Sequence, residues 1–165
     1  MSNSNDGPET ARMTSSPLAA MTGFRSVDHI AIAVRPGELE AQVDAYTLLG
    51  FTEVHREEVG GGDKVREVLL RIGDGPNLIQ LLEPTAADSP VQKLIDRNGG
   101  RGGFAHIAYR VDDIQRAFDD MTARGFQIID KAPRRGSRGT TVFFVHPKSR
   151  DHGAFGVLVE VVQEG

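Results

Sequence analysis

The sequence predicts an α+β fold in which two tandem βαβββ modules form a curved, partly open β-sheet cavity with helices on the outside. The first observation is a strand pattern that occurs twice, at residues 28–34 and 105–111. The second is that each copy is followed by a helical segment ending in Gly-Phe. Each half also closes with an apolar strand that contains one polar residue. Self-similarity over most of a chain indicates a duplicated unit, so the repeat decides the fold class.

The repeated strand alternates with period two, which places successive side chains on opposite faces of a sheet. In the first copy, the faces are Ile30, Ile32 and Val34 against His29, Ala31 and Ala33. In the second, they are Ile107, Tyr109 and Val111 against His106, Ala108 and Arg110. Alanines after a histidine leave room beside the imidazole, so this face predicts a cavity wall.

Each repeated strand is followed by a segment with helical spacing of apolar residues. Residues 36–49 present Leu39, Val43 and Tyr46, and residues 112–124 present Ile114, Phe118 and Met121. A glycine after each segment suits a left-handed helix stop, and the phenylalanine after it can fold back onto the helix. We therefore expect two equivalent helices.

The rest of module one supplies three strands. Residues 51–59 and 65–72 flank a glycine-rich hairpin turn, and the alternation places Val65, Glu67 and Leu69 on one face. A second turn at residues 73–76 leads into the strand that contains Gln80.

A linker helix is predicted between the modules, at about residues 89–98. Ser89 is an N-cap candidate, Pro90 suits the first helical position, and Gln92 completes a capping box. Module two continues with a basic segment at residues 131–139, a strand at 140–146 and a final strand at 157–161.

These elements define the expected organisation of the chain. Residues 1–23 are rich in Ser, Asn, Thr, Gly and Pro without apolar periodicity, and we expect a disordered tail. Residues 24–163 form one domain, with module one at about 24–84 and module two at about 104–163.

Composition excludes several classes of protein. The 165 residues are 39% hydrophobic and 25% charged, as in soluble globular proteins. A net charge of −4 without a basic stripe argues against a nucleic-acid partner. The absence of cysteine excludes disulfides and thiolate chemistry and fits a cytoplasmic protein. We find neither a signal peptide nor a run of membrane-spanning length, so no membrane partner is expected.

Four polar residues stand at matching points of the two modules: His29, Gln80, His106 and Glu160. If the modules pair about a pseudo-twofold axis, the four side chains converge inside the cavity. Imidazole nitrogens with carboxylate and amide oxygens suit a borderline divalent metal such as Co, Ni, Zn or Fe. Taken singly, each could be a core or edge-strand residue, but their duplicated register favours a metal site. The other histidines are assigned no role: His55 and His152 are expected to be solvated and His146 to pack in a loop.

Several stretches resemble the vicinal oxygen chelate (glyoxalase/bleomycin-resistance) superfamily, and within it the methylmalonyl-CoA epimerases. The similarity covers residues 24–163 in order. The matching stretches are Asp28-His29-Ile30-Ala31, Leu49-Gly50-Phe51, His55-Arg56-Glu57-Glu58, Gln80-Leu81-Leu82-Glu83-Pro84, Asp88-Ser89-Pro90, His106-Ile107-Ala108, Arg110-Val111-Asp112-Asp113-Ile114, His146-Pro147-Lys148-Ser149 and Gly156-Val157-Leu158-Val159-Glu160. Residues 150–155 are longer than the glycine turn usual in the family.

The resemblance implies a metal held by His29, Gln80, His106 and Glu160, commonly cobalt, with Zn, Ni, Mn or Fe as other possibilities. It implies interconversion of (2R)- and (2S)-methylmalonyl-CoA, an acyl-CoA as partner, and a homodimer. It also implies that Glu67 acts as an acid/base.

This chemistry is consistent with the residues. Removing a proton beside a thioester creates an enolate, whose charge a chelated metal would neutralise. Inversion needs proton delivery on the opposite face, and Glu160 is the candidate partner of Glu67. Candidate cations for the phosphates of CoA are Arg134, Arg135, Arg138, Lys148 and Arg150.

Two other classes of function stay open. One is another metalloenzyme on this fold, a glyoxalase-type isomerase or an extradiol dioxygenase, although an inward Gln80 counts against the dioxygenase. The other is a metal-free drug-binding protein, which has no need of four ligand-type residues. Preference between methylmalonyl and ethylmalonyl thioesters is also open.

Overall fold

The computed structural model describes residues 20–21, 23–148 and 155–165. The expected N-terminal tail lies almost wholly outside this part, as do Arg150, His152 and most of the 150–155 loop. Module one contains β1 (Phe24–Ala33), α1 (Leu39–Leu48), β2 (Phe51–Val59), β3 (Val65–Ile72) and β4 (Leu78–Pro84). After α2 (Pro90–Arg97), module two contains β5 (Gly103–Val111), α3 (Ile114–Ala123), β6 (Arg134–Arg135), the 3₁₀ turn η1 (Ser137–Gly139), β7 (Thr141–Val145) and β8 (Val159–Gln163).

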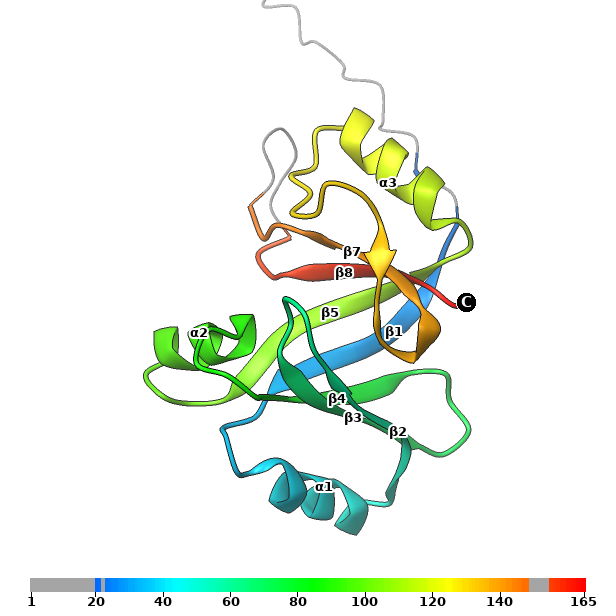
Figure 1. Cartoon of the computed structure of the whole chain (residues 1–165). Helices are drawn as coiled ribbons and strands as arrows, with labels where there is room; N and C mark the ends of the chain where they lie inside the picture. The colour runs from blue at the N-terminus through cyan, green and yellow to red at the C-terminus, as the bar shows by residue number, and fades with distance from the viewer. Residues whose placement is uncertain (1–19, 22, 149–154) are drawn as a thin grey trace, which may run out of the picture.

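The strands form one mixed sheet whose order is β2-β3-β4-β1-β5-β8-β7-β6. The order reads symmetrically from its centre, where β1 pairs antiparallel with β5. On either side, β1 pairs parallel with β4 and β5 pairs parallel with β8. Figure 1 shows β1 and β5 side by side in the middle, with α1 and α3 at opposite ends of the molecule. The predicted α+β class and the duplicated βαβββ order are therefore confirmed.

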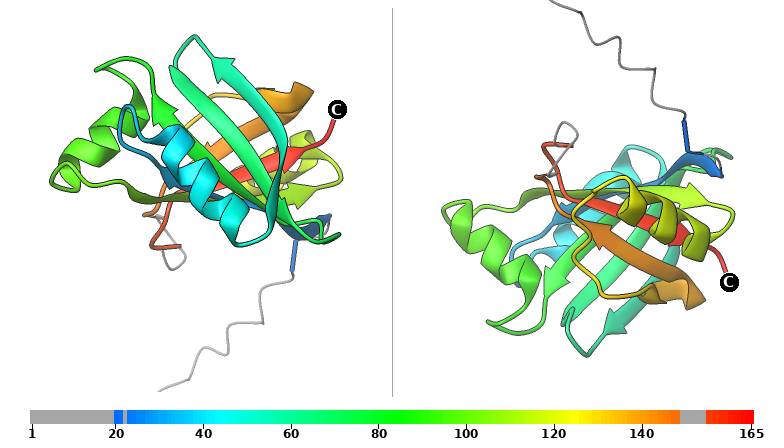
Figure 2. Two further views of the ribbon diagram at one scale, coloured as in Figure 1. Left: turned by 90° about the horizontal axis from the view of Figure 1, so that it is seen from below. Right: turned by 90° about the horizontal axis from the view of Figure 1, so that it is seen from above.

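Both long helices pack on the outer face of the curled sheet (Figure 2). In module one, Leu39 and Val43 of α1 join a buried cluster with Val68, Leu70 and Leu81. In module two, α3 contributes its own buried side chains to an equivalent cluster that contains Ile114, Ala117, Met121, Phe143, Val145, Val159 and Val161. These apolar clusters lie between the helices and the outer face of the sheet. The inner face of the sheet is therefore left for the polar residues.

The helix boundaries differ from the predicted ones. α1 begins three residues later than predicted, at Leu39, and α3 begins at Ile114 after an Asp113 N-cap that accepts a hydrogen bond from the Arg116 amide. Helix ends are set by where the first amides find acceptors, and hydrophobic periodicity does not locate them.

The predicted helix stops are confirmed. Gly50 and Gly125 adopt φ of 90° and 79°, in the left-handed region that favours glycine. Phe51 folds back onto Tyr46, with ring centroids 5.1 Å apart.

The capping prediction for α2 is half correct. Ser89 is buried and its hydroxyl oxygen accepts a hydrogen bond from the Val91 amide. Gln92 does not complete the capping box, because its side-chain amide donates to Asp96 one turn later. Among the described residues, no helix combines the length and apolarity needed to cross a membrane.

Candidate metal centre and active site

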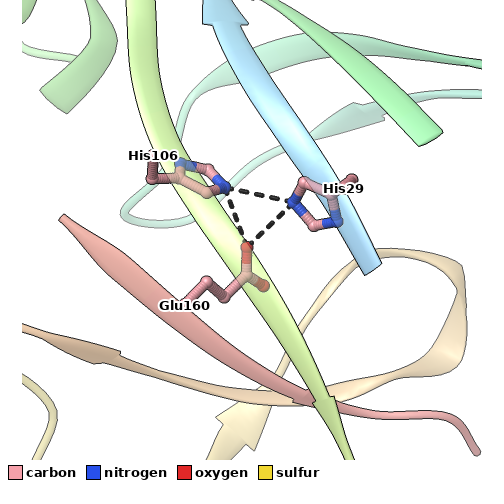
Figure 3. A group of neighbouring side chains, drawn as sticks. All are labelled: His29, His106 and Glu160. Carbon is pink, nitrogen blue, oxygen red and sulfur yellow. Dashed lines mark hydrogen bonds and ion pairs between the residues drawn. The ribbon is translucent and has the colours of Figure 1, made fainter. Parts of the chain in front are cut away.

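Three residues far apart in the sequence meet at the centre of the sheet. His29 lies on β1, His106 on β5 and Glu160 on β8, and Figure 3 shows their side chains pointing toward one another. The register explains the meeting, since Ala108 of β5 pairs with His29 on one side and with Glu160 on the other. Ala108 is fully buried, and its small side chain leaves the space into which the larger ones turn.

The three ligand-type atoms form a nearly equilateral triangle. The two histidine Nε2 atoms lie 3.1 Å apart, and Glu160 Oε2 lies 3.1 Å from His29 Nε2 and 2.9 Å from His106 Nε2. Octahedral coordination with bonds of about 2.1 Å places neighbouring ligand atoms about 3.0 Å apart. The triangle therefore has the size of one octahedral face.

Gln80 adds the fourth donor from β4. It pairs with Ala31, which pairs in turn with His106. Its side-chain amide donates to Glu67 Oε2 over 2.9 Å, and its carbonyl oxygen is buried with no hydrogen-bond partner in the part of the chain that the structure describes. A buried carbonyl oxygen normally finds a partner, so this atom suits a cation. The four residues thus fit a divalent metal.

Asp28 fixes the orientation of His29. Its Oδ1 lies 2.8 Å from His29 Nδ1, and the carboxylate is fully buried. When Nδ1 is the protonated nitrogen, the lone pair of Nε2 points into the triangle. Arg110 and Arg138 both donate to this carboxylate, at 2.6 and 2.8 Å. Asp28 precedes His29 in a stretch that resembles the family, but no pattern in the sequence indicates this role.

The electrostatics of the triangle favour a positive charge. Burial by itself lowers the pKa of His29, but its hydrogen bonds with Asp28 and Glu160 outweigh burial and raise that pKa to about 9. Burial raises the pKa of Asp28, yet hydrogen bonds with His29 and Arg110 bring it down to about 2. Burial opposes ionisation of Glu160 as well, but His106 and His29 hold its pKa well below the usual range. A proton on His29 occupies the place that a metal ion would take.

Glu67 lies beside Gln80 on the inner face of β3, as predicted, and is 3% exposed. Burial raises the pKa of its carboxyl, the Ser137 side chain opposes that shift, and the charge of Glu57 raises the pKa further. A carboxylate with a raised pKa is a better proton acceptor. Ser137, in the glycine-flanked η1 turn, received no role from the sequence.

These groups face a cavity of about 740 Å³. Glu67, Gln80, His106 and Glu160 line it together with apolar side chains such as Leu82 and Phe144 and with two arginines, Arg97 and Arg134. The cavity therefore combines an acid/base group, metal-type donors and cations for an anionic ligand.

The predicted phosphate cations lie in different places. Arg134 lines the cavity and contacts Asp63 and Asp130. Arg138 is turned inward onto Asp28, so its guanidinium does not face solvent as that role requires. Arg135 and Lys148 are exposed. Arg97 of α2 lines the cavity but was not among the predicted cations.

The prediction that His55 is solvated is wrong. Its side chain is 30% exposed, and its Nε2 lies 3.3 Å from Glu57 Oε1 and 4.0 Å from Glu67 Oε1. A register shift in the β2–β3 pairing between Glu53 and His55 moves the later residues of β2 to the inner face. The prediction that His146 packs in a loop is consistent with the hydrogen bond that its Nδ1 accepts from the Lys148 amide.

Comparison with known proteins supports one family. Residues 28–144 match the family model of the Glyoxalase/Bleomycin resistance protein/Dioxygenase superfamily. The chain is 32% identical over 142 residues to mitochondrial methylmalonyl-CoA epimerase of Dictyostelium discoideum, covering 86% of this chain and 80% of the relative. It is 33% identical over 139 residues to an ethylmalonyl-CoA/methylmalonyl-CoA epimerase of Cereibacter sphaeroides, covering 83% and 96%.

A solved structure of a variant of Streptomyces coelicolor methylmalonyl-CoA epimerase, in complex with 2-nitronate-propionyl-CoA, has the same fold. Its TM-score is 0.75 at 35% identity, covering 86% of this chain and 99% of that one. The chain therefore belongs to the Glyoxalase/Bleomycin resistance protein/Dioxygenase superfamily and, within it, to the methylmalonyl-CoA epimerase family of enzymes.

Proposed function

We propose that the protein is a metal-dependent epimerase that interconverts (2R)- and (2S)-methylmalonyl-CoA through loss and return of the C2 proton. The observation that supports it most is the Glu67–Gln80 hydrogen bond, which joins a buried acid/base to the His29–His106–Glu160 triangle in one cavity. The epimerase relatives support the substrate class.

His29, Gln80, His106 and Glu160 would hold the metal, for which we propose Co²⁺ first and Zn²⁺, Ni²⁺, Mn²⁺ or Fe²⁺ as alternatives. When bound, the ion supplies positive charge beside the oxygen on which negative charge develops as the C2 proton leaves. Buried walls such as Leu82 and Val142 exclude water from the same region and strengthen that electrostatic effect.

Glu67 takes the C2 proton in this proposal. Its buried carboxylate has a raised pKa, and the hydrogen bond from Gln80 fixes one oxygen, while the other oxygen has no hydrogen-bond partner among the described residues. The free oxygen is the one available to accept a proton.

Glu160 is our candidate for serving the opposite face of C2. Its low pKa suits metal binding better than proton transfer, so the two glutamates are expected to differ in what their loss does. Arg97 and Arg134 are placed to meet anionic groups of the CoA moiety.

Deuterium exchange tests the proposal. Each methylmalonyl-CoA epimer is incubated separately in deuterated water with metal-stripped and Co²⁺-reconstituted protein, and C2 deuterium and epimer ratio are followed together. We expect exchange with inversion only when metal is present. Absence of exchange with reconstituted protein refutes the function, and ethylmalonyl-CoA in the same assay measures substrate preference. A homodimer and a cytoplasmic location stay predictions.

A further inference from the structure

A second group of ligand-type side chains lies next to the triangle. It consists of His55 and Glu57 on β2 and Glu67 on β3, and we call it the β2–β3 cluster. His55 and Glu57 share a face because they are two residues apart, and Glu67 is the direct cross-strand partner of Glu57. The three ligand atoms all lie within 4.8 Å of one another.

Two buried atoms of the β2–β3 cluster have no hydrogen-bond partner among the described residues. They are His55 Nε2 and Glu67 Oε1, and both are aimed into the cluster. Glu67 is 3% exposed, so its free oxygen is shielded from water by the protein. A buried acceptor of this kind loses its hydration without compensation unless a ligand occupies the site.

The two carboxylates also repel each other. Like charges directly opposite in a β-ladder destabilise the pair. The neighbouring arginines are engaged elsewhere: the guanidinium of Arg138 contacts Asp28, that of Arg66 contacts Glu83, and that of Arg56 contacts Glu40 and Glu53. Among the described residues, the backbone amide of Arg138 is the only hydrogen-bond donor to the Glu57 carboxylate, over 2.9 Å.

We propose that the β2–β3 cluster is a second divalent-cation site, selective for Zn²⁺-like ions and inhibitory when filled. Imidazole nitrogens and carboxylate oxygens are both zinc ligands in proteins. Zinc bonds of 2.0–2.1 Å in a tetrahedron separate ligand atoms by about 3.4 Å. The His55–Glu57 separation of 3.3 Å matches this, and the His55–Glu67 separation of 4.0 Å needs a side-chain adjustment of about half an ångström.

Inhibition follows because the two functions share Glu67, and this part of the inference rests on the proposed function. An ion on Glu67 Oε1 occupies the oxygen that would accept the C2 proton. Low metal concentration should therefore activate the enzyme by filling the triangle, and excess zinc should inhibit it by filling the β2–β3 cluster.

The test counts bound Zn²⁺ per chain by equilibrium dialysis and elemental analysis, starting from metal-stripped protein. We expect two ions in the wild type and one in both His55→Gln and Glu57→Gln, with second-site affinity at least about tenfold lower in each. Glu58→Gln is the matched control, since it removes the same charge from the next, exposed residue and should keep two ions. His106→Ala should lose the other ion and keep this one.

The count is independent of activity, so the two proposals can fail separately. A single ion in the wild type, or two ions retained in His55→Gln and Glu57→Gln, overturns the second site. Two bound Zn²⁺ ions, in a protein that shows no epimerase activity when reconstituted with one equivalent of Co²⁺, preserve the second site and refute the proposed function. In active protein, the zinc concentration that halves activity should rise at least about tenfold in Glu57→Gln but not in Glu58→Gln.

Discussion

The side-chain amide of Gln80 donates a hydrogen bond of 2.9 Å to the carboxylate of Glu67, and both residues are buried. Because the amide nitrogen is used in this way, the Gln80 carbonyl oxygen is turned to the other side, where no described residue forms a hydrogen bond with it. One residue thus connects the proposed base to the proposed metal ligands. The orientation of Glu67 and the donor set of the metal are coupled through this amide.

Glu67→Gln should abolish proton transfer while leaving the metal site intact. The amide keeps the size of the side chain but cannot accept the C2 proton, and general acid–base catalysis typically contributes about a hundred- to ten-thousand-fold. We expect turnover to fall by about that factor with normal metal content. Epimerisation and deuterium uptake from each epimer, measured with metal content, check this.

Glu160→Gln is the contrasting variant. It removes a charge from the triangle, so metal content and turnover should fall together.

The Glu67→Gln variant has its own contradicting outcome. Wild-type turnover in metal-replete Glu67→Gln protein would show that Glu67 is only a buried strand carboxylate.

Metal removal should abolish activity, and a divalent ion should restore it. Chelation followed by addition of Co²⁺, Zn²⁺, Ni²⁺, Mn²⁺ or Fe²⁺ measures which ion restores turnover best. His106→Ala removes one donor of the triangle and should lower metal affinity by at least about tenfold, with the circular dichroism spectrum retained. Full turnover in metal-free wild-type protein would contradict the mechanism.

Metal binding should strengthen as pH rises toward 9. In the metal-free protein the pKa of His29 is raised to about 9, so below that pH a proton must leave before Nε2 can bind a metal. The affinity should therefore rise about tenfold per pH unit up to about 9 and level off above it. Protonated His29 conversely stabilises the metal-free fold below its ordinary pKa of 6.5, and this contribution is lost as pH rises through about 9.

Asp28→Asn tests the cause of that pH dependence. Without the carboxylate the pKa of His29 should fall and the levelling-off point should move to lower pH. The metal affinity at the high-pH plateau should drop by roughly 10–100-fold. Metal titrations at several pH values measure both effects. An unchanged pH profile would mean that Glu160 alone raises the pKa of His29.

The duplicated strands allowed the triangle and Gln80 to be predicted, because period-two alternation fixes which face each side chain occupies. Period-two alternation does not fix the face of a side chain where the strand is irregular. On β2, Phe51 packs in the outer cluster with Tyr46, whereas Val59, eight residues later, packs toward the cavity. Strict alternation would put both on one face, and the register shift after Glu53 is what separates them. The same shift turns His55, which was expected to be solvated, toward Glu67.

Contacts between modules left no local pattern in the sequence. Arg138 reaches Asp28 across 110 residues, and Ser137 approaches Glu67 from the other module. These contacts depend on how η1 lies against module one, which neither spacing nor composition specifies. The sequence around the N-terminus of α1 likewise does not reveal its hydrogen-bond acceptor, which comes from β4 of the same module.

Glu83 is that acceptor, and its removal should destabilise the fold. Its Oε1 accepts hydrogen bonds from the Gly37 and Leu39 amides, and its other oxygen contacts Arg66. Glu38 occupies the N-cap position, but its side chain makes no capping hydrogen bond. Loss of an N-cap costs about 0.5–2 kcal/mol, and the half-exposed Arg66 can be rehydrated, so Glu83→Ala should lower the free energy of unfolding by about 1–2 kcal/mol. Glu38→Ala is the control. It loses only an exposed ion pair with Arg35, so the free energy of unfolding should change by less than about 1 kcal/mol. Urea unfolding of both variants measures the difference, and equal losses would mean that α1 does not depend on Glu83.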